Sequence, residues 1–430
     1  MDSIPWIAYA MTLVLATMIL LYTSWRFRAY RRSGLPPGRL GWPYLGETLE
    51  FISCAYSPRP ESFMDKRRLL YGKVFKSHIL GSPTIVSTDA EVSRFVLQSD
   101  AKLFVPSYPR SLTELMGKSS ILLISGSLQR RIHGLIGAFF KSPNLKSQIT
   151  QDMQKYVLEA MDGWKDDQTI YIQDQAKSAK KRMVKLVQKI IEERRKAGGG
   201  TPRDPRDVVD VLLNDASQQL TVDLISDNMI DLMIPGEDSV PVLMTLAIKY
   251  LTDCPLALHQ LLEENMRLKE RKDELGEPFC WGDYMSLSFT QNVITETLRM
   301  GNIIIGVMRK AMKDVTVKGC LIPKGWCVFP YFRSVHLDEQ LYECPHQFNP
   351  WRWQDKDVGT CNFTPFGGGQ RLCPGVDLAR LEASIFLHHL VTRFTWEAEP
   401  DSIVNFPTVR MKGRMPVKVK RRRAPPSLVC

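Results

Sequence analysis

The sequence contains no C-x-x-C pair, no internal repeat and no low-complexity tract. Its nine cysteines are odd in number and widely spaced, which argues against a disulfide framework and against a zinc site. An apolar content of 44% over 430 residues allows one large core or two ordinary ones, so disorder is not expected as the main state. The net charge of +11 is compatible with nucleic acid, an anionic membrane face or an acidic protein partner, and does not choose among them.

Charge is also absent from the start of the chain. No charged residue occurs between Ser3 and Ser24, a length that suits one crossing of a bilayer core. Arginines follow this run and a single aspartate precedes it, so the basic side is expected to stay in the cytosol. A cleaved signal peptide would need a charged start and a small-residue cleavage site, and the sequence shows neither. We predict three parts: a membrane anchor over residues 1–25, a basic, proline-rich hinge over 26–40 and one domain over 41–430.

The spacing of apolar residues predicts a mainly helical body with small β-sheets. Helices are expected over residues 127–140, 147–164, 178–196, 222–252, 255–276, 288–300 and 377–394. Short strands are expected within residues 71–88 and 306–330. The helix over 222–252 contains Pro235, Gly236 and Pro241, which should bend it and free backbone carbonyls. A helix–loop–helix boundary would also explain these residues.

One cysteine differs from the other eight in its neighbours. The stretch FTPFGGGQRLCPG places three glycines, an arginine and a Pro-Gly pair around Cys373. The glycines allow left-handed backbone angles and a close approach to something large and flat. A helix predicted directly after Cys373 would stabilise a thiolate, and Arg371 is placed to pair with an anion. These features suit a haem iron with its propionates, whereas a glycine-rich turn with an inert cysteine is the alternative.

The stretch FGGGQRLCPG resembles the haem-binding loop of the cytochrome P-450 family, F-x-x-G-x-R-x-C-x-G. Every fixed position of this pattern matches, at Phe366, Gly369, Arg371, Cys373 and Gly375. The resemblance implies the mainly helical fold of that family, with haem b as the cofactor. It also implies that Cys373 is the metal ligand and that the other four residues belong to the cofactor-binding loop.

Two further motifs occur in the order that the family shows. The stretch ETLR contains Glu296 and Arg299, which lie one helical turn apart and can pair on one helix face. The stretch FNPWRW contains Arg352. Taken alone, such a Glu–Arg spacing is usually a surface ion pair. By the resemblance, the three residues form a cluster that braces the haem-binding core.

The family also places an acid and an alcohol over the face that binds oxygen, and the stretch PGEDSV matches this pattern in part. Asp238 and Ser239 are therefore the predicted catalytic residues, which would relay protons to bound dioxygen. Ser239 lacks the methyl group of the threonine that is usual in the family, so its rotamer is less fixed. The alternative is that Ser239 is only the N-cap of a helix that begins after a break.

Arg309 and Arg371 are the propionate anchors that the resemblance implies. A second propionate-binding group of the family, Trp-x-x-x-Arg on an early helix, is replaced here by Gln129 and His133. His133 is a candidate partner of a propionate, and a solvent-facing basic cluster is equally compatible with the sequence there.

The resemblance implies further partners: O2, an NADPH-dependent reductase that docks on a basic face, a steroid substrate and membrane lipid, but no nucleic acid. It places the chain in the endoplasmic reticulum membrane as a single-pass protein whose domain faces the cytosol.

Four stretches carry a finer resemblance: LMIPGEDSVPVLMTLAIKYL, FTPFGGGQRLCPGVDLARLE, SLQRRIHGLIG and FPTVRMK. They are similar to the plant brassinosteroid hydroxylases, and within them to the steroid C-23 hydroxylases. It implies hydroxylation of the side chain of C-22-hydroxylated steroids, with C-22 or a ring position as alternatives. Four segments would line the pocket, and their apolar character suits a sterol: residues 104–117, the helix over 222–252, 302–306 and 405–409.

One departure from the family is large. Between TIYIQD and SAKKRMVKLVQ the family normally carries several dozen more residues, so we expect an internal segment to be missing near residues 174–178. Those residues would form the roof of the pocket, and their loss would expose apolar surface. A haem-binding chain without turnover is therefore the alternative to an active monooxygenase. A membrane-anchored nucleic-acid or lipid-binding protein, suggested by the net charge and by KVKRRR, is a third hypothesis.

Overall fold

The computed structural model describes residues 4–29, 33–42, 45–109, 113–114, 120–175, 222–354, 362–406 and 408–422. The predicted helix over 178–196 and the connector that follows it lie outside these residues.

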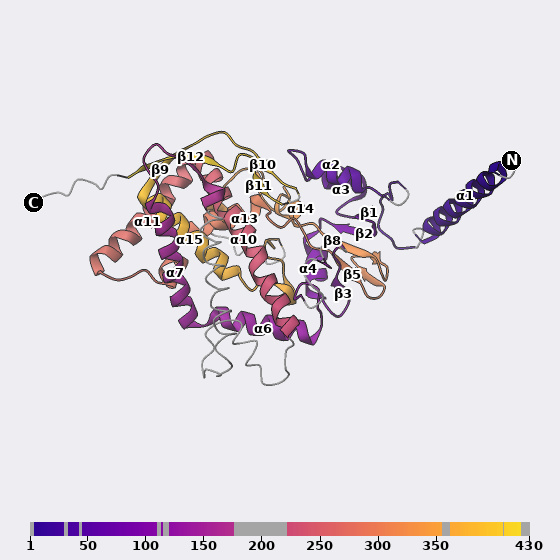
Figure 1. The fold of residues 1–430 in the computed structure, drawn as a ribbon, viewed down its shortest axis with the longest axis horizontal. Helices are drawn as coiled ribbons and strands as arrows, with labels where there is room; N and C mark the ends of the chain where they lie inside the picture. The colour runs from indigo at the N-terminus through magenta and orange to yellow at the C-terminus, as the bar shows by residue number, and fades with distance from the viewer. Residues whose placement is uncertain are drawn as a thin grey trace, which may run out of the picture.

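Helices make up most of the described chain (Figure 1). Their bounds are α1 Ile4–Ala29, α2 Thr48–Ala55, α3 Ser62–Tyr71, α4 Ala90–Gln98, α6 Ser127–Lys141, α7 Pro143–Asp162, α10 Val222–Asp253, α11 Pro255–Leu275, α12 Trp281–Met285, α13 Ser288–Gly301, α14 Phe332–His336 and α15 Val376–Arg393. Two 3-10 helices are η1 Pro350–Trp353 and η2 Gly369–Arg371. The mainly helical prediction with small β-sheets is confirmed.

Helix α15 lies at the centre of the largest apolar core. Its residues from Leu381 to Thr392 are buried without interruption, and α7, α10, α11 and α13 pack around it (Figure 1). A helix that is buried on all sides needs apolar or paired side chains around its whole circumference, which the sequence ASIFLHHLV provides. Because α15 begins three residues after Cys373, the predicted metal ligand is attached directly to this core.

The strands form one larger sheet and three small ones. Their bounds are β1 Val74–Ile79, β2 Ser82–Ser87, β3 Phe104–Pro106, β4 Thr169–Tyr171, β5 Arg309–Ala311, β6 Val315–Val317, β7 Cys320–Ile322, β8 Cys327–Pro330, β9 Phe394–Ala398, β10 Ile403–Val404, β11 Arg410–Met411 and β12 Pro416–Arg421. The larger sheet has the order β1-β2-β8-β5-β3, and only its β2–β8 pair is parallel. In the register of this sheet, Arg309 lies between Pro106 and Val328. One predicted propionate anchor is thus held on an inner strand.

Helix α10 runs without interruption through Pro235 and Pro241. The helix–loop–helix alternative is therefore wrong, and so is the alternative that Ser239 caps the start of a helix. A proline inside a helix has no N–H to donate to the carbonyl four residues earlier. The sequence alone therefore predicts an unpaired carbonyl four residues before each proline. The hydroxyl of Thr245 donates to the Pro241 carbonyl at 2.6 Å, one turn after the second proline.

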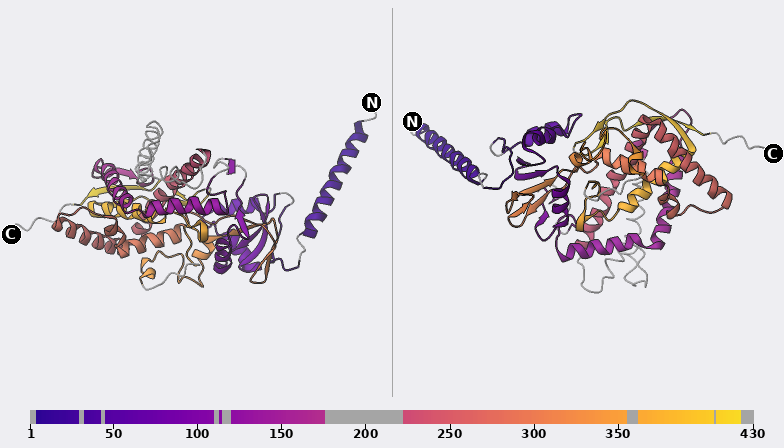
Figure 2. Two further views of the ribbon diagram at one scale, coloured as in Figure 1. Left: turned by 90° about the horizontal axis from the view of Figure 1, so that it is seen from below. Right: turned by 180° about the vertical axis from the view of Figure 1, so that it is seen from behind.

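Helix α1 covers the predicted anchor and projects away from the body in every view (Figure 2). Among the helices of the described ranges, none has by itself the length and apolar character to cross a membrane. One pair, residues 238–253 with Pro255–Leu275, passes together by length and composition, and it is bent by 116°. The anchor over residues 1–25 and the hinge over 26–40 stay predictions.

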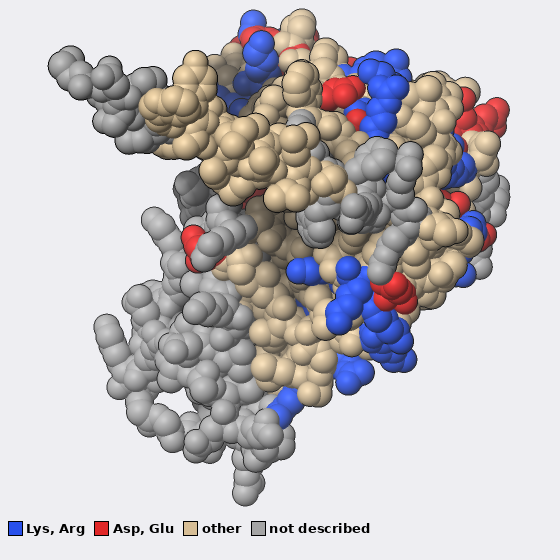
Figure 3. Space-filling view, turned by 90° about the vertical axis from the view of Figure 1, so that its right-hand side faces the viewer, with Lys and Arg blue, Asp and Glu red and all other residues tan. Residues whose placement is uncertain are grey.

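Basic side chains are distributed rather than concentrated on the face from which α1 projects. Figure 3 shows Lys and Arg there in several separate groups, with Asp and Glu beside some of them. The net charge of +11 is therefore not gathered into one patch on this face.

Candidate functional site

Glu296 is the centre of a buried network on α13. It is 0% exposed and forms a bidentate pair with Arg299, with N–O distances of 2.7 and 2.8 Å. Arg352 Nε also donates to Glu296 at 3.0 Å, so the structure brings together the three residues of the predicted cluster. The indole of Trp353 and the backbone N–H of Asn349 donate to the same carboxylate at 2.9 and 3.0 Å. A buried carboxylate with this many donors ties α13 to η1.

His336 links this network to the loop that carries Cys373. Its Nε2 accepts from the backbone N–H of Thr364 at 3.0 Å, and its Nδ1 donates to Asn302 at 2.7 Å. Burial, with Arg299 nearby, lowers the pKa of His336 to about 3, so the ring is neutral as these two bonds require. The Arg299 guanidinium donates to the His336 carbonyl at 2.8 Å. The position of the loop is therefore coupled to the Glu296 network.

The loop from Phe366 to Gly375 has the left-handed backbone that its glycines predict at two positions. Gly367 has φ 77° and Gly369 has φ 64°. A Cβ at Gly369 would overlap the carbonyl oxygen of Leu97, so the close neighbour of this glycine is the end of α4. We had expected the glycines to approach something large and flat. At Gly369 the close neighbour is instead the backbone of Leu97, which only a glycine can approach so closely.

Cys373 is half-buried, and its backbone N–H donates to the Phe366 carbonyl at 3.1 Å. Burial raises the pKa of the Cys373 thiol, although the Gly375 N–H at the start of α15 acts in the opposite direction. In the chain without a bound metal, burial therefore outweighs the stabilisation of a thiolate that we expected from the start of α15. A thiol in such a position is deprotonated when a metal binds to it.

The two predicted propionate anchors differ in their contacts. Arg371 donates to Asp100 at 2.8 Å and to the carbonyls of Ile121 and Ile124 at 2.9 and 2.5 Å. Arg309 is buried, and its Nε has no hydrogen-bond partner among the described residues. Arg309 thus keeps a buried donor for a ligand, whereas Arg371 is largely occupied by the protein.

The early helix α6 contacts the Cys373 loop through its two substituted positions. Gln129 Nε2 donates to the Gln370 carbonyl at 3.2 Å, and His133 Nε2 donates to the Leu372 carbonyl at 2.6 Å. The structure therefore places His133 on the backbone of the loop, beside Cys373. A pocket of about 140 Å³ reaches Cys373 from this side, which is smaller than the roughly 300–1,000 Å³ of typical small-molecule sites.

The predicted catalytic pair lies in the interior of α10. Asp238 is exposed, Ser239 is half-buried and Val240 is buried. Because successive residues of a helix are rotated by about 100°, the two polar side chains leave α10 in different directions. Their arrangement gives one group with access to water and one group nearer the interior.

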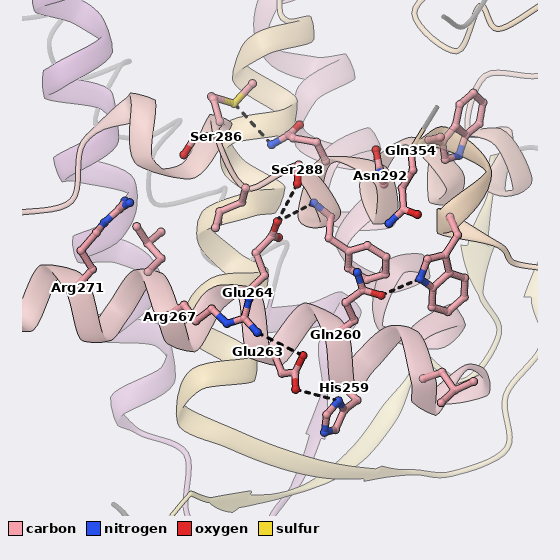
Figure 4. A pocket seen from close by; sticks show the side chains of 18 residues that line it. His259, Gln260, Glu263, Glu264, Arg267, Arg271, Ser286, Ser288, Asn292 and Gln354 are labelled. Carbon is pink, nitrogen blue, oxygen red and sulfur yellow. Dashed lines mark hydrogen bonds and ion pairs between the residues drawn. The ribbon is translucent and has the colours of Figure 1, made fainter. Parts of the chain in front are cut away.

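A second, polar hollow lies away from this site. It is a groove of about 1250 Å³ between α11, the loop before α13 and η1. Figure 4 shows the side chains that line it. Several of its charged groups have partners nearby: Glu263 lies 3.7 Å from His259 and 4.0 Å from Arg267, and Arg271 lies 3.7 Å from Asp283. Glu264 accepts from the backbone N–H of Phe289 at 2.7 Å, which caps the start of α13. Cys373 does not line this groove, and its contacts are those of a structural surface.

The residues around Cys373 fit a haem. The Cys373 sulfur is a soft donor of the kind that would hold a haem iron, and it lies on a loop just ahead of a core helix. The buried Arg309 Nε is an orphaned cationic donor of the kind that a propionate would satisfy. Together with the braced Glu296 network, this donor set and the helical fold define a haem-thiolate protein.

The comparisons with known proteins give the family. The cytochrome P450 family model matches residues 169–420. The chain belongs to the cytochrome P450 family, a family of haem-dependent monooxygenases. A solved structure, the retinoic acid-bound cyanobacterial CYP120A1, shares the fold with a TM-score of 0.75 at 22% identity, covering 90% of this chain and 99% of that chain.

Several plant proteins are much more similar in sequence. Cytochrome P450 90D2 of Oryza sativa subsp. japonica is 61% identical over 436 residues, which covers 90% of this chain and 89% of the relative. A 3-epi-6-deoxocathasterone 23-monooxygenase of Arabidopsis thaliana is 58% identical, again covering 90% and 89%. A 3beta,22alpha-dihydroxysteroid 3-dehydrogenase of the same plant is 40% identical and covers 91% and 94%.

Sequence reasoning missed Asp100, His336 and Trp353. Each contacts a residue that lies far away in the chain, so no local sequence motif reveals the contact. Asp100 and Arg371, for example, are 271 positions apart. Only Trp353 carried a signal, because it directly follows Arg352 in the stretch that had already been singled out.

Proposed function

We propose that this chain is a steroid monooxygenase that hydroxylates C-23 in the side chain of C-22-hydroxylated steroids. The observation that carries the proposal is the intact Cys373 loop in a chain 58% identical to a 3-epi-6-deoxocathasterone 23-monooxygenase. A second relative with that printed activity is 50% identical. The fused rings and aliphatic side chain of a steroid suit the apolar segments predicted to line the pocket.

The proposed cofactor is haem b, which when bound activates O2 for insertion of one oxygen atom into a C–H bond. Cys373 would supply the thiolate ligand, and Arg309 would bind a propionate through its orphaned Nε. Asp238 would take a proton from water and Ser239 would pass it inward, since the first is exposed and the second half-buried.

The proposed electron donor is an NADPH-dependent reductase, and the proposed location is the endoplasmic reticulum membrane. Residues 1–25 would form the single anchor, with the arginine-rich hinge and the domain on the cytosolic side. The support for this part is the uncharged run from Ser3 to Ser24 and the basic residues after it.

A second candidate is a haem protein without turnover. The alignment with the rice relative extends over 436 positions, yet 90% of 430 residues is only about 387 residues. About 49 aligned positions therefore have no counterpart in this chain, which agrees with the expected internal loss near residues 174–178. A pocket without its roof would leave the substrate and the reacting centre open to water.

The test is to incubate membranes carrying the full chain and a reductase with C-22-hydroxylated steroids, followed by mass spectrometry. A C-23 alcohol that depends on NADPH is the expected product. A 3-ketone in place of the alcohol would support the activity named for the 40%-identical relative and overturn C-23 hydroxylation. A normal haem-thiolate spectrum without any product would establish the second candidate.

A further inference from the structure

A buried carboxylate lies between the two arginines of the cofactor site. Asp100 is 1% exposed, and its Oδ2 accepts from Arg371 Nε at 2.8 Å. Its Oδ1 lies 3.6 Å from Arg309 Nε, and neither of these two atoms has a hydrogen-bond partner among the described residues. One buried carboxylate therefore lies next to two buried guanidinium groups.

The charges of this group do not balance. Two guanidinium groups and one carboxylate leave one positive charge, and an uncompensated buried charge is costly. Arg371 has the short, hydrogen-bonded contact with Asp100, so the surplus lies at Arg309. One further carboxylate, of the kind that a propionate supplies, would neutralise the group and satisfy the orphaned Nε of Arg309.

Arg371 is held on two sides. Asp100 fixes its Nε, while the carbonyls of Ile121 and Ile124 accept from its two terminal nitrogens. Asp100 follows α4 by two residues, and the same end of α4 packs against Gly369. The loop ahead of Cys373 is thus docked by a glycine contact and an ion pair that both involve the end of α4.

We propose that Asp100 is a positioning residue of the cofactor site. It fixes Arg371, and through Arg371 the Cys373 loop, and it leaves Arg309 as the cation that meets a propionate. The inference rests on the proposed haem site, but its structural half concerns the chain before haem binds. Asp100 itself acts through the two arginines rather than by contact with the reacting atoms.

The first measurement needs no cofactor. Hydrogen exchange of the peptide spanning residues 366–375 is compared in the haem-free full chain, in Asp100→Asn and in Asp338→Asn. Asp338 is the matched control, because it is 2% exposed and accepts from two cations, Arg68 and Lys73, both at 2.8 Å. We expect Asp100→Asn to speed exchange of this peptide roughly tenfold or more, since a hydrogen bond to a charged partner is lost, and Asp338→Asn to leave it unchanged. Equal exchange in the two variants would overturn the proposal.

The second measurement follows haem itself, as the rate of its transfer to an excess of an apo-globin. Asp100→Asn should release haem several-fold faster than the unchanged chain or Asp338→Asn. The double variant Asp100→Asn with Arg371→Gln should lose haem no faster than Arg371→Gln alone, because both changes break one contact. Additive effects, or faster peptide exchange with unchanged haem release, would overturn the link from Asp100 to the cofactor.

Two further outcomes are covered by the same experiment. If Asp100→Asn does not fold, Asp100→Glu keeps the charge at a longer reach, and we expect a shift of the same sign but smaller size; no shift would contradict the proposal. If the unchanged chain takes up no haem, the proposed function fails, and the exchange measurement still decides whether Asp100 positions the loop.

Discussion

The side of the molecule that carries Cys373 and the side that carries Asp238 are held in different ways. On the Cys373 side most of the polar groups named above are buried and paired: Glu296 accepts from four residues, and Arg371 has a carboxylate and two carbonyls. On α10, Asp238 is exposed and Ser239 half-buried, and their directions follow from their places in the helix. The Cys373 side is thus held by contacts between distant parts of the chain, whereas Asp238 and Ser239 lie next to each other on a single helix.

This difference predicts which substitutions should lower both stability and haem content and which should lower only turnover. Loss of a partner in the buried network leaves uncompensated charges, which is strongly destabilising. Loss of a polar group on α10 leaves the helix and the cofactor site in place. The predictions below are ordered from the largest expected effect to the smallest.

The largest effect is expected at Glu296. Glu296→Ala leaves Arg299 and Arg352 buried without their carboxylate, which should cost about 3–5 kcal/mol, a large part of the stability of an ordinary domain. The urea concentration at the midpoint of unfolding and the haem content should both fall strongly. The exposed Glu274→Ala is the control and should behave like the unchanged chain. Normal haem content in Glu296→Ala would contradict the claim that the buried Glu296 network holds the Cys373 side of the molecule.

The next effect concerns turnover on α10. Asp238→Asn and Ser239→Ala should each lower product formation by roughly 10²-fold, because each removes a group from the proposed proton path. The haem spectrum should stay unchanged, as measured on the same samples. Asp253→Asn, at the other end of the same helix, should keep full activity. If either change removed haem instead, α10 would be part of the cofactor framework and the comparison would fail.

A smaller effect is expected from pH, and only on the buried side. Burial lowers the pKa of His336 and His388 to about 3 and the pKa of His389 to about 4. The unfolded chain binds protons on these residues below about pH 6.5, whereas the folded chain does not, so stability falls as the pH drops from 6.5 toward 4. Each histidine should cost roughly 1.4 kcal/mol per pH unit in that window.

Urea midpoints at pH 7.5 and 5.5 measure this loss. The exposed His259 serves as the control, and His259→Gln should keep the whole dependence. A midpoint that does not move between the two pH values would mean that the buried histidines bind protons in the folded chain as they do in the unfolded chain, and would contradict the prediction.

The smallest effect is expected at the groove of Figure 4. Glu264 accepts from the backbone N–H groups of Phe289 and Thr290 at the start of α13. Glu264→Ala should therefore destabilise the chain by about 1 kcal/mol, the usual cost of a lost helix cap, and leave haem uptake unchanged. Glu263→Ala, next to it but paired only with surface partners, should cost less than half of that. Equal costs would show that the cap carries no special weight.

Much of the fold follows from local sequence, and less of the site does. The bounds of helices α6 and α13 were predicted to within one residue, because their apolar spacing reflects packing along one element. Gly276 ends α11 with φ 63°, as its place predicts. Asp100 and His336 could not be found in this way, since their partners are set by how α4, α14 and the Cys373 loop pack together. The thiol of Cys373 shows the same limit: the nearby helix start was visible in the sequence, but the burial that outweighs it was not.

The central claim is that Cys373 holds a haem iron through its sulfur. The most direct measurement is the reduced carbon-monoxide difference spectrum of the full chain beside that of Cys373→Ser at equal haem input. The unchanged chain should give the strongly red-shifted Soret band of thiolate-ligated haem, and Cys373→Ser should give none. The same band in both proteins, or in neither, would contradict the account.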